Sequence, residues 1–441
     1  MFGTDGVRGK AGVPPLDPAT VRRLGVALVR ALPAGAPRRL LTGRDTRASG
    51  VWIERELACG AASQGADVVS AGVIPTPGVA YLARTGGFGA GVMISASHNP
   101  FEDNGIKVFS GGGEKFTEDL ERQVEAIVAD RGLPVPAGEA PAVGSAALVG
   151  AYEDHLRKVL PEPGRLGRLR MAIDCANGAT SEVAPRLLAR LGFEVDCLGC
   201  RPDGRNINLD CGSTHPERLA ARVAADGFRL GVAFDGDGDR AIFVDHTGRV
   251  LDGDAILLLC AAQMQAEGRL RGNAVVATVM SNLGLELGLR ALGIDLIRCK
   301  VGDKYVMEEM LKRGLSLGGE QSGHIIFSDY LFTGDGLCTT LNVLRTMAVT
   351  GRELADLASA LVTYPQVLIN VPVQARVDLA TVPAVKAVMT RVTGQLDGTG
   401  RLLVRYSGTE PLLRIMLEGR DRAEIQHWGE EIAAAVREHL G

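Results

Sequence analysis

Three aspartates, Asp235, Asp237 and Asp239, alternate with glycines near the middle of the chain. Carboxylates this close repel one another unless a hard cation neutralises them, and the glycines allow the backbone to curl around such an ion. An EF-hand loop begins in the same way, but here Arg240 stands in place of its glycine and His246 in place of its last glutamate. The pattern therefore predicts Mg²⁺, which accepts a few carboxylates and completes its shell with phosphate oxygens or water.

An acidic, solvated turn is the alternative interpretation of the same residues. Residues 231–234 before the aspartates and 241–244 after them are apolar and read as buried strands. Because a solvated turn would not need apolar strands on both sides, a metal site is the interpretation that we favour.

Ser97 is the candidate nucleophile, in the loop Ser-Ala-Ser-His-Asn-Pro of residues 95–100. Pro100 favours an extended Asn99 and keeps this loop from continuing as a helix. A serine hydroxyl is a weak nucleophile unless a base or a metal activates it, and no Gly-x-Ser-x-Gly elbow of the esterase type surrounds this one. An ordinary turn is the alternative. A phosphoserine bound to the metal accounts for this loop and the aspartate loop together.

A third polar feature lies near the C-terminus, in Arg-Tyr-Ser-Gly-Thr-Glu-Pro of residues 405–411. Two arginines can grip a phosphate through their planar forks, and the turn offers hydroxyl and backbone N–H donors. The residues concerned are Arg405, Ser407, Gly408, Thr409 and Arg414. With a formal net charge of -4, the protein does not attract a phosphorylated ligand from a distance, so local arginines must do so. Surface arginines beside a turn are the alternative.

Helical and strand periods alternate along most of the chain, which is typical of α/β domains. Strands are expected at 39–42, 66–70, 91–94, 170–174, 193–196, 231–234, 274–278, 295–298 and 315–317, and helix starts at Asp17-Pro18 and Thr117. After about residue 362 the order changes to strand, helix, two strands and helix. We therefore expect three α/β domains with mixed sheets, 1–145, 146–250 and 251–362, and a smaller α+β domain, 363–441.

The polar loops follow apolar strands, where open α/β sheets place their ligands. A further loop of this kind is Gly-Glu-Gln-Ser-Gly-His, residues 319–324. Four such loops from four domains predict one shared cleft.

Composition narrows the class of protein. The 441 residues include 48 Lys+Arg against 52 Asp+Glu, spread along the chain, so the electrostatic footprint of a nucleic-acid binder is missing. The longest apolar stretch, 256–262, is far shorter than the roughly 20 residues of a membrane span, and the first residues do not read as a signal peptide. We expect a cytoplasmic protein with neither a nucleic-acid nor a membrane partner.

The 8 cysteines are too sparse for a disulfide scaffold and are expected to be reduced. Cys197, Cys200, Cys211 and His215 supply the ligand types of a zinc site. Their spacing is irregular for such a site, and free cysteine is a common small buried residue, so we do not predict structural zinc.

Taken together, residues 2–9, 95–100, 235–240, 319–324 and 405–411 resemble the α-D-phosphohexomutase superfamily, and the resemblance runs from the first residues to the last domain. Ala before the serine and Gln321 resemble the bacterial branch that acts on glucosamine phosphates. Relatives acting on mannose or glucose phosphates tend toward Gly before the serine and Met in place of Gln321. Lys304 stands where this branch commonly has Arg, which keeps the charge but loses the bidentate fork.

The resemblance implies a role for each motif residue. Ser97 carries the phosphoryl group and, with Asp235, Asp237 and Asp239, holds Mg²⁺. Glu320 and Ser322 bind sugar hydroxyls, and the arginine loop binds the phosphate that is not transferred. Candidates for proton transfer are Lys107 and His324, and charge near the serine is stabilised by Arg8 and Arg240.

The resemblance also implies the fold and the reaction. The fold is three α/β domains and a C-terminal domain of the TATA-box-binding type around one cleft, and bacterial members are often homodimers. The reaction interconverts glucosamine 6-phosphate and glucosamine 1-phosphate, a small phosphosugar, through a glucosamine 1,6-bisphosphate intermediate, on the way to UDP-N-acetylglucosamine. A phosphomannomutase/phosphoglucomutase activity is the nearer alternative. A noncatalytic phosphosugar sensor is the distant one, and it would need neither Ser97 nor the aspartates.

Overall fold

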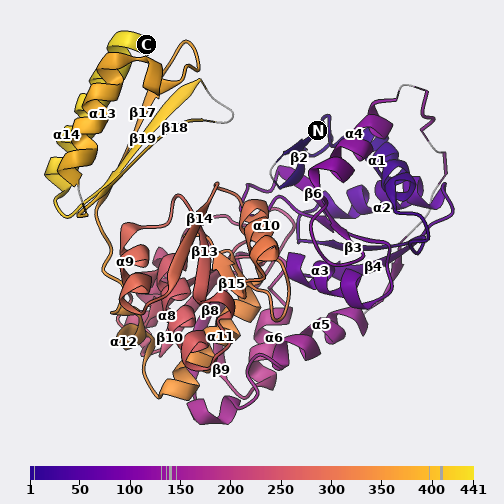
Figure 1. The fold of residues 1–441 in the computed structure, drawn as a ribbon. Coiled ribbons are helices and arrows are strands. Elements are labelled where there is room, and N and C mark those ends of the chain that lie inside the picture. The colour runs from indigo at the N-terminus through magenta and orange to yellow at the C-terminus, as the bar shows by residue number, and fades with distance from the viewer. Residues whose placement is uncertain are drawn as a thin grey trace. The chain divides into compact units, whose positions relative to one another are not determined.

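The chain forms two compact units in the computed structural model, which describes all residues except 4, 131, 136, 139–141, 146, 397 and 408–410. The first unit comprises Met1–Met280 and Gly293–Ala360, and the second comprises Ser281–Leu292 and Leu361–Gly441 (Figure 1). The first unit contains three sheets and the second contains one.

The first sheet has seven strands in the order β1-β2-β6-β5-β3-β4-β7. Its parallel centre, β5-β3-β4, is continued by the antiparallel strands β6 and β2. The strands are β1 Phe2–Gly3, β2 Gly6–Lys10, β3 Arg39–Arg44, β4 Asp67–Val73, β5 Ala90–Ile94, β6 Asp103–Ser110 and β7 Val143–Gly144, and the helices are α1 Pro18–Ala31, α2 Gly50–Ala62, α3 Thr76–Thr85 and α4 Glu118–Ala129.

The two helix starts predicted from the sequence are confirmed. Asp17 caps α1 by accepting a hydrogen bond from the Thr20 N–H, with Pro18 in the first turn. Thr117 caps α4 through the Leu120 N–H, and three acidic residues of the first turn complement the positive end of the helix dipole.

The second sheet has the order β12-β11-β10-β8-β9. Strands β10 and β11 are entirely buried and pair antiparallel, so the aspartate loop is the connection between them. The elements are α5 Ala147–Arg157, β8 Arg170–Asp174, α6 Val183–Arg190, β9 Glu194–Leu198, α7 Glu217–Asp226, β10 Leu230–Phe234, β11 Ala241–Asp245 and β12 Val250–Leu251.

The third sheet has the order β14-β13-β15-β16. Its elements are α8 Gly253–Ala266, β13 Ala274–Thr278, β14 Asp295–Cys299, α10 Asp303–Arg313, β15 Leu317–Gly319, β16 Ile325–Phe327, α11 Gly336–Thr350 and α12 Leu354–Ala358. The strand expected at 315–317 begins only at Leu317. Gly314 ends α10 in the left-handed conformation, and the Leu315 N–H still bonds to the Met310 carbonyl, so the preceding residues belong to the helix ending.

The second unit has the predicted order of strand, helix, two strands and helix, with an antiparallel sheet β17-β19-β18. Its elements are β17 Gln366–Pro372, α13 Pro383–Leu396, β18 Arg401–Tyr406, β19 Leu412–Glu418 and α14 Arg422–Leu440, together with α9 Leu283–Ala291 from the middle of the chain. In β17 buried Val367 and Val371 alternate with exposed Leu368, so one face of the sheet is covered. Helices α13 and α14 lie side by side beside this sheet (Figure 1).

Within the part of the chain that the structure describes, none of the helices combines the length and the apolar character that crossing a membrane requires.

Two glycines allow α1 and α2 to approach closely. A Cβ at Gly60 would lie 1.9 Å from the Arg22 carbonyl oxygen, and one at Gly25 would lie 2.1 Å from that of Leu57. We expect Gly60→Ala to destabilise the first unit by about 1–3 kcal/mol, because the helices must separate, although alanine is the better helix former. The measurement is thermal unfolding by calorimetry.

Gly150 in α5 is the matched control for Gly60, since nothing lies within 4 Å of a Cβ placed there. Gly150→Ala is expected to leave the melting temperature unchanged or to raise it slightly. Equal melting temperatures for Gly60→Ala and wild type would contradict the close helix contact.

Asp335 caps α11, where it accepts the Cys338 N–H and the Tyr152 hydroxyl, at 2.9 Å each. Burial raises the pKa of Asp335 to about 6, above its ordinary 3.8. The folded state thus binds this proton more tightly than the unfolded state, and the associated stability is lost as pH rises from about 4 through about 6.

At pH 4, Asp335→Asn should therefore have the same melting temperature as wild type. At pH 7 the variant should be the more stable protein, by up to about 3 kcal/mol in free energy of unfolding. Asparagine keeps the capping oxygen but carries no charge. The measurement is the melting temperature of both proteins from pH 4 to pH 7, and a difference that does not change with pH would contradict the assignment.

Candidate active site

The predicted metal loop is a buried turn between β10 and β11. Asp235, Asp237 and Asp239 are all buried, and each offers a carboxylate oxygen within 4.8 Å of the others. Like charges at this separation in a protein interior repel strongly, because little water is present to screen them. The turn is therefore stable only with positive charge beside it.

The structure brings Ser97 onto this turn from the loop after β5. The Ser97 hydroxyl donates to Asp235 Oδ2 at 2.5 Å, and the serine is buried. Its φ of +52° is in the left-handed region, which is uncommon for a residue other than glycine. The meeting of Ser97 with the aspartates is the arrangement that the sequence predicted, while their catalytic roles stay predictions.

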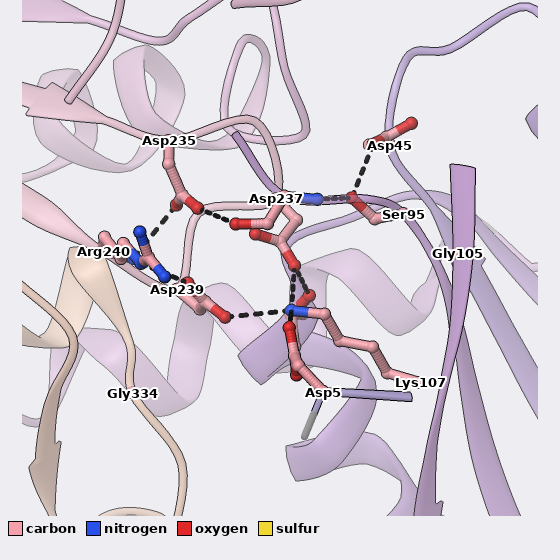
Figure 2. Close-up of polar contacts among 12 residues, drawn as sticks. Asp5, Asp45, Ser95, Gly105, Lys107, Asp235, Asp237, Asp239, Arg240 and Gly334 are labelled. Atoms are coloured by element: carbon pink, nitrogen blue, oxygen red, sulfur yellow. Dashed lines mark hydrogen bonds and ion pairs between the residues drawn. The ribbon is translucent and has the colours of Figure 1, made fainter. Parts of the chain in front are cut away.

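Lys107 of β6 supplies positive charge to the aspartates, as Figure 2 shows. Its Nζ lies 2.8 Å from Asp237 Oδ2, 3.2 Å from Asp239 Oδ2 and 3.0 Å from Asp5 Oδ2. Burial by itself lowers the pKa of Lys107, but Asp237, Asp239 and Asp5 outweigh it and hold that pKa well above its ordinary value. These three carboxylates therefore favour the ammonium form of Lys107.

Asp235 and Asp239 differ in the direction in which their pKa is shifted. Burial raises the pKa of Asp235, and Asp239 and Asp237 raise it further, well above its ordinary value. Burial also opposes ionisation of Asp239, yet Lys107 and His324 hold its pKa well below the ordinary value. The Lys107 cation thus lies beside Asp239, whereas the surroundings of Asp235 disfavour its charged form.

The chemistry of the donors fits a hard divalent cation. Oδ1 of Asp237 is buried and accepts no hydrogen bond. Oδ1 of Asp239 also accepts none, although His324 Nδ1 lies 3.6 Å and Arg240 Nε 3.9 Å from it. A buried carboxylate oxygen without a partner costs free energy unless a cation contacts it. Oxygen donors only, from closely spaced carboxylates, are the set that Mg²⁺ prefers.

A second group of potential ligands, Asp239, Asp303 and His324, lies beside the first. Lys115 already neutralises it, since its Nζ contacts both Asp303 and Asp5. The Gly334 N–H donates to His324 Nε2 at 3.0 Å, so in the neutral ring the proton is on Nδ1, which faces Asp239 Oδ1 at 3.6 Å. This group is therefore less suited to hold an ion than the aspartate turn.

Arg8 and Arg240 place further positive charge near Ser97. Arg240 Nη1 lies 3.3 Å from His98 Nδ1, and the Ser97 hydroxyl lies at 3.3 Å from the same atom. Burial lowers the pKa of His98 to about 4, with further lowering by Arg240 and Arg8, so this ring is neutral. The Nε atoms of both arginines are buried without a hydrogen-bond acceptor. Donors of this kind fit an anion such as a phosphoryl group.

The predicted sugar-binding loop, residues 319–324, forms the turn between β15 and β16. This turn lies against the aspartate turn. The Ala241 N–H donates to the Gly323 carbonyl at 3.1 Å, and Arg240 forms a β-bridge with His324. Glu320 Oε1 accepts the Gly302 N–H at 3.1 Å, and the Ser322 hydroxyl is buried without a partner. A carboxylate and a hydroxyl beside the metal loop can bind the hydroxyl groups of a sugar.

The arginine loop belongs to the second unit. Arg405 of β18 and Arg414 of β19 are directly opposite in the antiparallel register, and partial burial together with Arg414 lowers the pKa of Arg405. The Ser407 carbonyl accepts from Arg376 at 2.7 Å. Two adjacent guanidinium groups favour an anionic ligand. The predicted residues Gly408 and Thr409 lie outside the described residues.

The cysteines of the chain are free thiols, with Cys197 exposed, Cys200 half-buried and Cys211 buried. In the described part of the chain, the groups close enough to share an ion are the two carboxylate-containing ones above. The structure thus gives no positive reason to assign a metal to Cys197, Cys200, Cys211 and His215.

Sequence reasoning missed several residues of the site: Asp5, Asp45, Arg47, Lys115 and Asn208. Asp45 and Arg47 directly follow the apolar strand β3, so the rule that ligands lie after strands could have found them. Asp45 Oδ2 accepts the Ser95 hydroxyl at 2.6 Å (Figure 2). Lys115 and Asn208 belong to no sequence motif that would have indicated them as site residues.

Comparison with known proteins finds family models that match most of the chain. Models of phosphoglucomutase/phosphomannomutase domains match residues 1–133 as α/β/α domain I, 151–248 as domain II, 252–364 as domain III and 368–435 as the C-terminal domain. The chain belongs to the phosphoglucomutase/phosphomannomutase family.

Individual relatives are similar over their full lengths. A phosphoglucosamine mutase of Solibacter usitatus is 50% identical over 444 residues, covering 100% of this chain and 99% of the relative. A crystal structure of a phosphoglucomutase/phosphomannomutase family protein from Burkholderia thailandensis has a TM-score of 0.81 at 25% identity, covering 100% of this chain and 99% of that one. The fold is shared by Aspergillus fumigatus N-acetylphosphoglucosamine mutase, in complex with GlcNAc-6P and magnesium, with a TM-score of 0.68 at 19% identity over 100% of this chain and 96% of that one.

Asp235→Asn is expected to weaken divalent-cation binding by about tenfold or more, because it removes one of three ligand charges. Titration calorimetry with Mg²⁺ or Mn²⁺ measures this without any substrate. Asp119→Asn on the exposed surface is the control with the same change in charge, and it should bind as wild type does. Equal affinity in Asp235→Asn would exclude the aspartate turn as the metal site.

Proposed function

We propose that the chain catalyses the interconversion of glucosamine 6-phosphate and glucosamine 1-phosphate. The contact between the Ser97 hydroxyl and Asp235 inside a buried acidic turn is the observation that carries the phosphoserine part of this proposal. The full-length relative at 50% identity, named phosphoglucosamine mutase, supports the choice of sugar.

In the proposed cycle, phosphorylated Ser97 donates its phosphoryl group to a hydroxyl of the bound sugar phosphate. The bond from phosphorus to Ser97 Oγ breaks, the bond from phosphorus to the sugar oxygen forms, and the proton of the sugar hydroxyl passes on, in net terms, to Ser97 Oγ. The glucosamine 1,6-bisphosphate then turns around and returns its other phosphate to Ser97. The phosphorylated serine is thereby restored.

The residues of the first unit divide this work among them. Asp235, Asp237 and Asp239 hold Mg²⁺, which when bound neutralises charge on the phosphoryl oxygens. Arg8 and Arg240 bind the phosphoryl group as it passes between oxygens. Lys107 and His324 are the two candidates for carrying the proton of the sugar hydroxyl to Ser97 Oγ, each taking up one proton for each one that it gives. No single group supplies the acceleration that phosphate-monoester chemistry demands, so positioning and charge must act together.

Binding of the sugar phosphate uses the remaining predicted residues. Glu320 and Ser322 bind sugar hydroxyls, and Arg405, Ser407, Gly408, Thr409 and Arg414 bind the phosphate that is not transferred. The proposal also includes a homodimer, a place in the cytoplasm and the four domains 1–145, 146–250, 251–362 and 363–441.

Ser97→Ala is expected to abolish mutase turnover, by about 10³-fold or more, because no oxygen remains to carry the phosphoryl group. Its melting temperature should stay close to that of wild type. Ser63→Ala is the control, since the Ser63 hydroxyl makes local contacts at the end of α2: it donates to the Gly60 carbonyl and accepts from Gln64 Nε2. The measurements are turnover of glucosamine 1-phosphate and intact-protein mass, which in wild type should show a phosphoryl group on Ser97.

Normal turnover by Ser97→Ala would end the phosphoserine proposal. A kcat/KM that is higher on mannose or glucose phosphates than on glucosamine phosphates would instead favour the phosphomannomutase/phosphoglucomutase alternative. A wild-type chain that binds phosphosugars but neither turns them over nor carries phosphate on Ser97 would favour the sensor.

A further inference from the structure

Two donors from different parts of the first unit bind the same pair of carbonyl oxygens in the Ser97 loop. Asn208 Nδ2 donates to the Ser97 carbonyl at 2.9 Å and to the Asn99 carbonyl at 3.0 Å. Arg47 Nη2 donates to these same oxygens at 2.9 Å and 2.8 Å. A carbonyl oxygen has two lone pairs, so each of the two carbonyls is fully used by this clamp of Asn208 and Arg47.

The clamp holds a backbone that would not adopt this conformation unaided. Ser97 has a φ of +52°, and left-handed backbone costs a residue with a side chain roughly 1–2 kcal/mol. On the other side of Ser97, its N–H donates to Ser95 Oγ at 3.0 Å, and the Ser95 hydroxyl donates to Asp45 Oδ2 at 2.6 Å. Hydrogen bonds on both sides of the residue therefore fix the direction of its side chain.

Asn208 also connects the Ser97 loop with the aspartate turn. A Cβ at Gly236 would lie 2.4 Å from the Ser97 carbonyl oxygen and 2.9 Å from Asn208 Nδ2. The backbone of the metal turn thus packs directly on the clamp, at the residue between Asp235 and Asp237. A shift of the Ser97 carbonyl would move the hydroxyl relative to Asp235.

The loop that carries Asn208 is itself anchored. The Asn208 N–H donates to the Ala176 carbonyl at 2.9 Å, and the Ala48 N–H donates to the Gly204 carbonyl at 2.9 Å. Asn208 has a φ of +59°, a conformation that asparagine tolerates better than most residues. These backbone hydrogen bonds therefore hold the loop in place, and with it the Asn208 side-chain amide.

We propose that Asn208 is a positioning residue, which holds the Ser97 hydroxyl in line with Asp235 and the metal turn. The inference rests on the proposed phosphoserine function for its kinetic consequence. An amide NH₂ is suited to this role because its two N–H groups reach two carbonyls at once. A carboxylate at this position would direct oxygen at oxygen and repel both of them.

The test uses Asn208→Gly and Asn208→Asp in the full-length protein. Glycine accepts the left-handed backbone and removes only the amide, whereas aspartate keeps the shape and reverses the polarity. We expect kcat to fall by about 10- to 100-fold in Asn208→Gly and further in Asn208→Asp, with KM changed little, because a nucleophile misplaced by about 1 Å loses rate and not affinity for the sugar.

Asn206→Ala is the matched control, two residues away in the same loop. The Asn206 side chain bonds only to that loop, with Nδ2 on the Arg201 carbonyl at 3.0 Å and Oδ1 on the Asp203 N–H at 3.0 Å. It should keep kcat within about twofold, as expected for a change that touches neither Ser97 nor the metal turn. A kcat loss in Asn206→Ala equal to that in Asn208→Gly would assign the effect to the loop as a whole and overturn the proposal.

Hydrogen exchange of the peptide containing residues 95–100 supplies a readout that needs no activity. Exchange there should quicken in Asn208→Gly and remain as in wild type in Asn206→Ala. Unchanged exchange or unchanged kcat in Asn208→Gly would overturn the clamp. A wild-type protein without turnover on glucosamine phosphates would instead overturn the proposed function, while the exchange measurement would still test the clamp.

Discussion

Mutual repulsion among three buried carboxylates is the constraint on which the rest of the site depends. Asp235, Asp237 and Asp239 are held with oxygens within 4.8 Å of one another in a protein interior. Such a cluster is stable only when cationic groups surround it or a metal binds it. Lys107 is a cationic group of this kind, since it forms ion pairs with Asp237 and Asp239. One oxygen of each of these aspartates accepts no hydrogen bond and is available to a metal ion.

This constraint explains why separate sheets have to meet. The aspartates come from the β10–β11 turn, whereas Lys107 comes from β6 of the first sheet, 130 and 132 residues away along the chain from Asp237 and Asp239. Arg240 faces Ser97 through His98, and the turn between β15 and β16 lies against Arg240. The charges of the aspartates and of Lys107 therefore balance only in the folded unit, because these residues come from different sheets.

The proposed mechanism also depends on a loop backbone that holds its position. If a phosphoryl group is transferred in line, the Ser97 oxygen and the aspartate turn must keep their relative positions. The fully buried Arg47 side chain contacts Asp45 at 2.8 Å and the carbonyls of Ser97 and Asn99. A buried guanidinium destabilises the fold unless its donors are used, and here these donors hold the chain next to Ser97, the proposed nucleophile. In the second unit, by contrast, the paired Arg405 and Arg414 lie on regular antiparallel strands, where the sheet register alone sets their spacing.

The sequence by itself determined what is local. The starts of α1 and α4 followed from Asp17-Pro18 and Thr117 because a helix cap is made by residues three positions apart. The spacing of Asp235, Asp237 and Asp239 likewise predicted one close group of carboxylates, which the structure contains. The motif positions also fixed the family, since their residue types resemble it across the whole chain. The strand expected at 315–317 lies two residues later, at Leu317–Gly319, because the end of α10 extends through hydrogen bonds that apolar character does not reveal.

Tertiary structure alone decided which distant groups meet. Residues from 50 to 188 positions apart in the chain meet in three sets of contacts: Lys107 with Asp5, Lys115 with Asp5 and Asp303, and Arg47 and Asn208 with the Ser97 carbonyl. No periodicity or composition encodes such contacts, because they arise from how whole sheets pack. The sequence therefore shows which residue types belong to the site, whereas their charge states and the directions of their side chains depend on the tertiary structure.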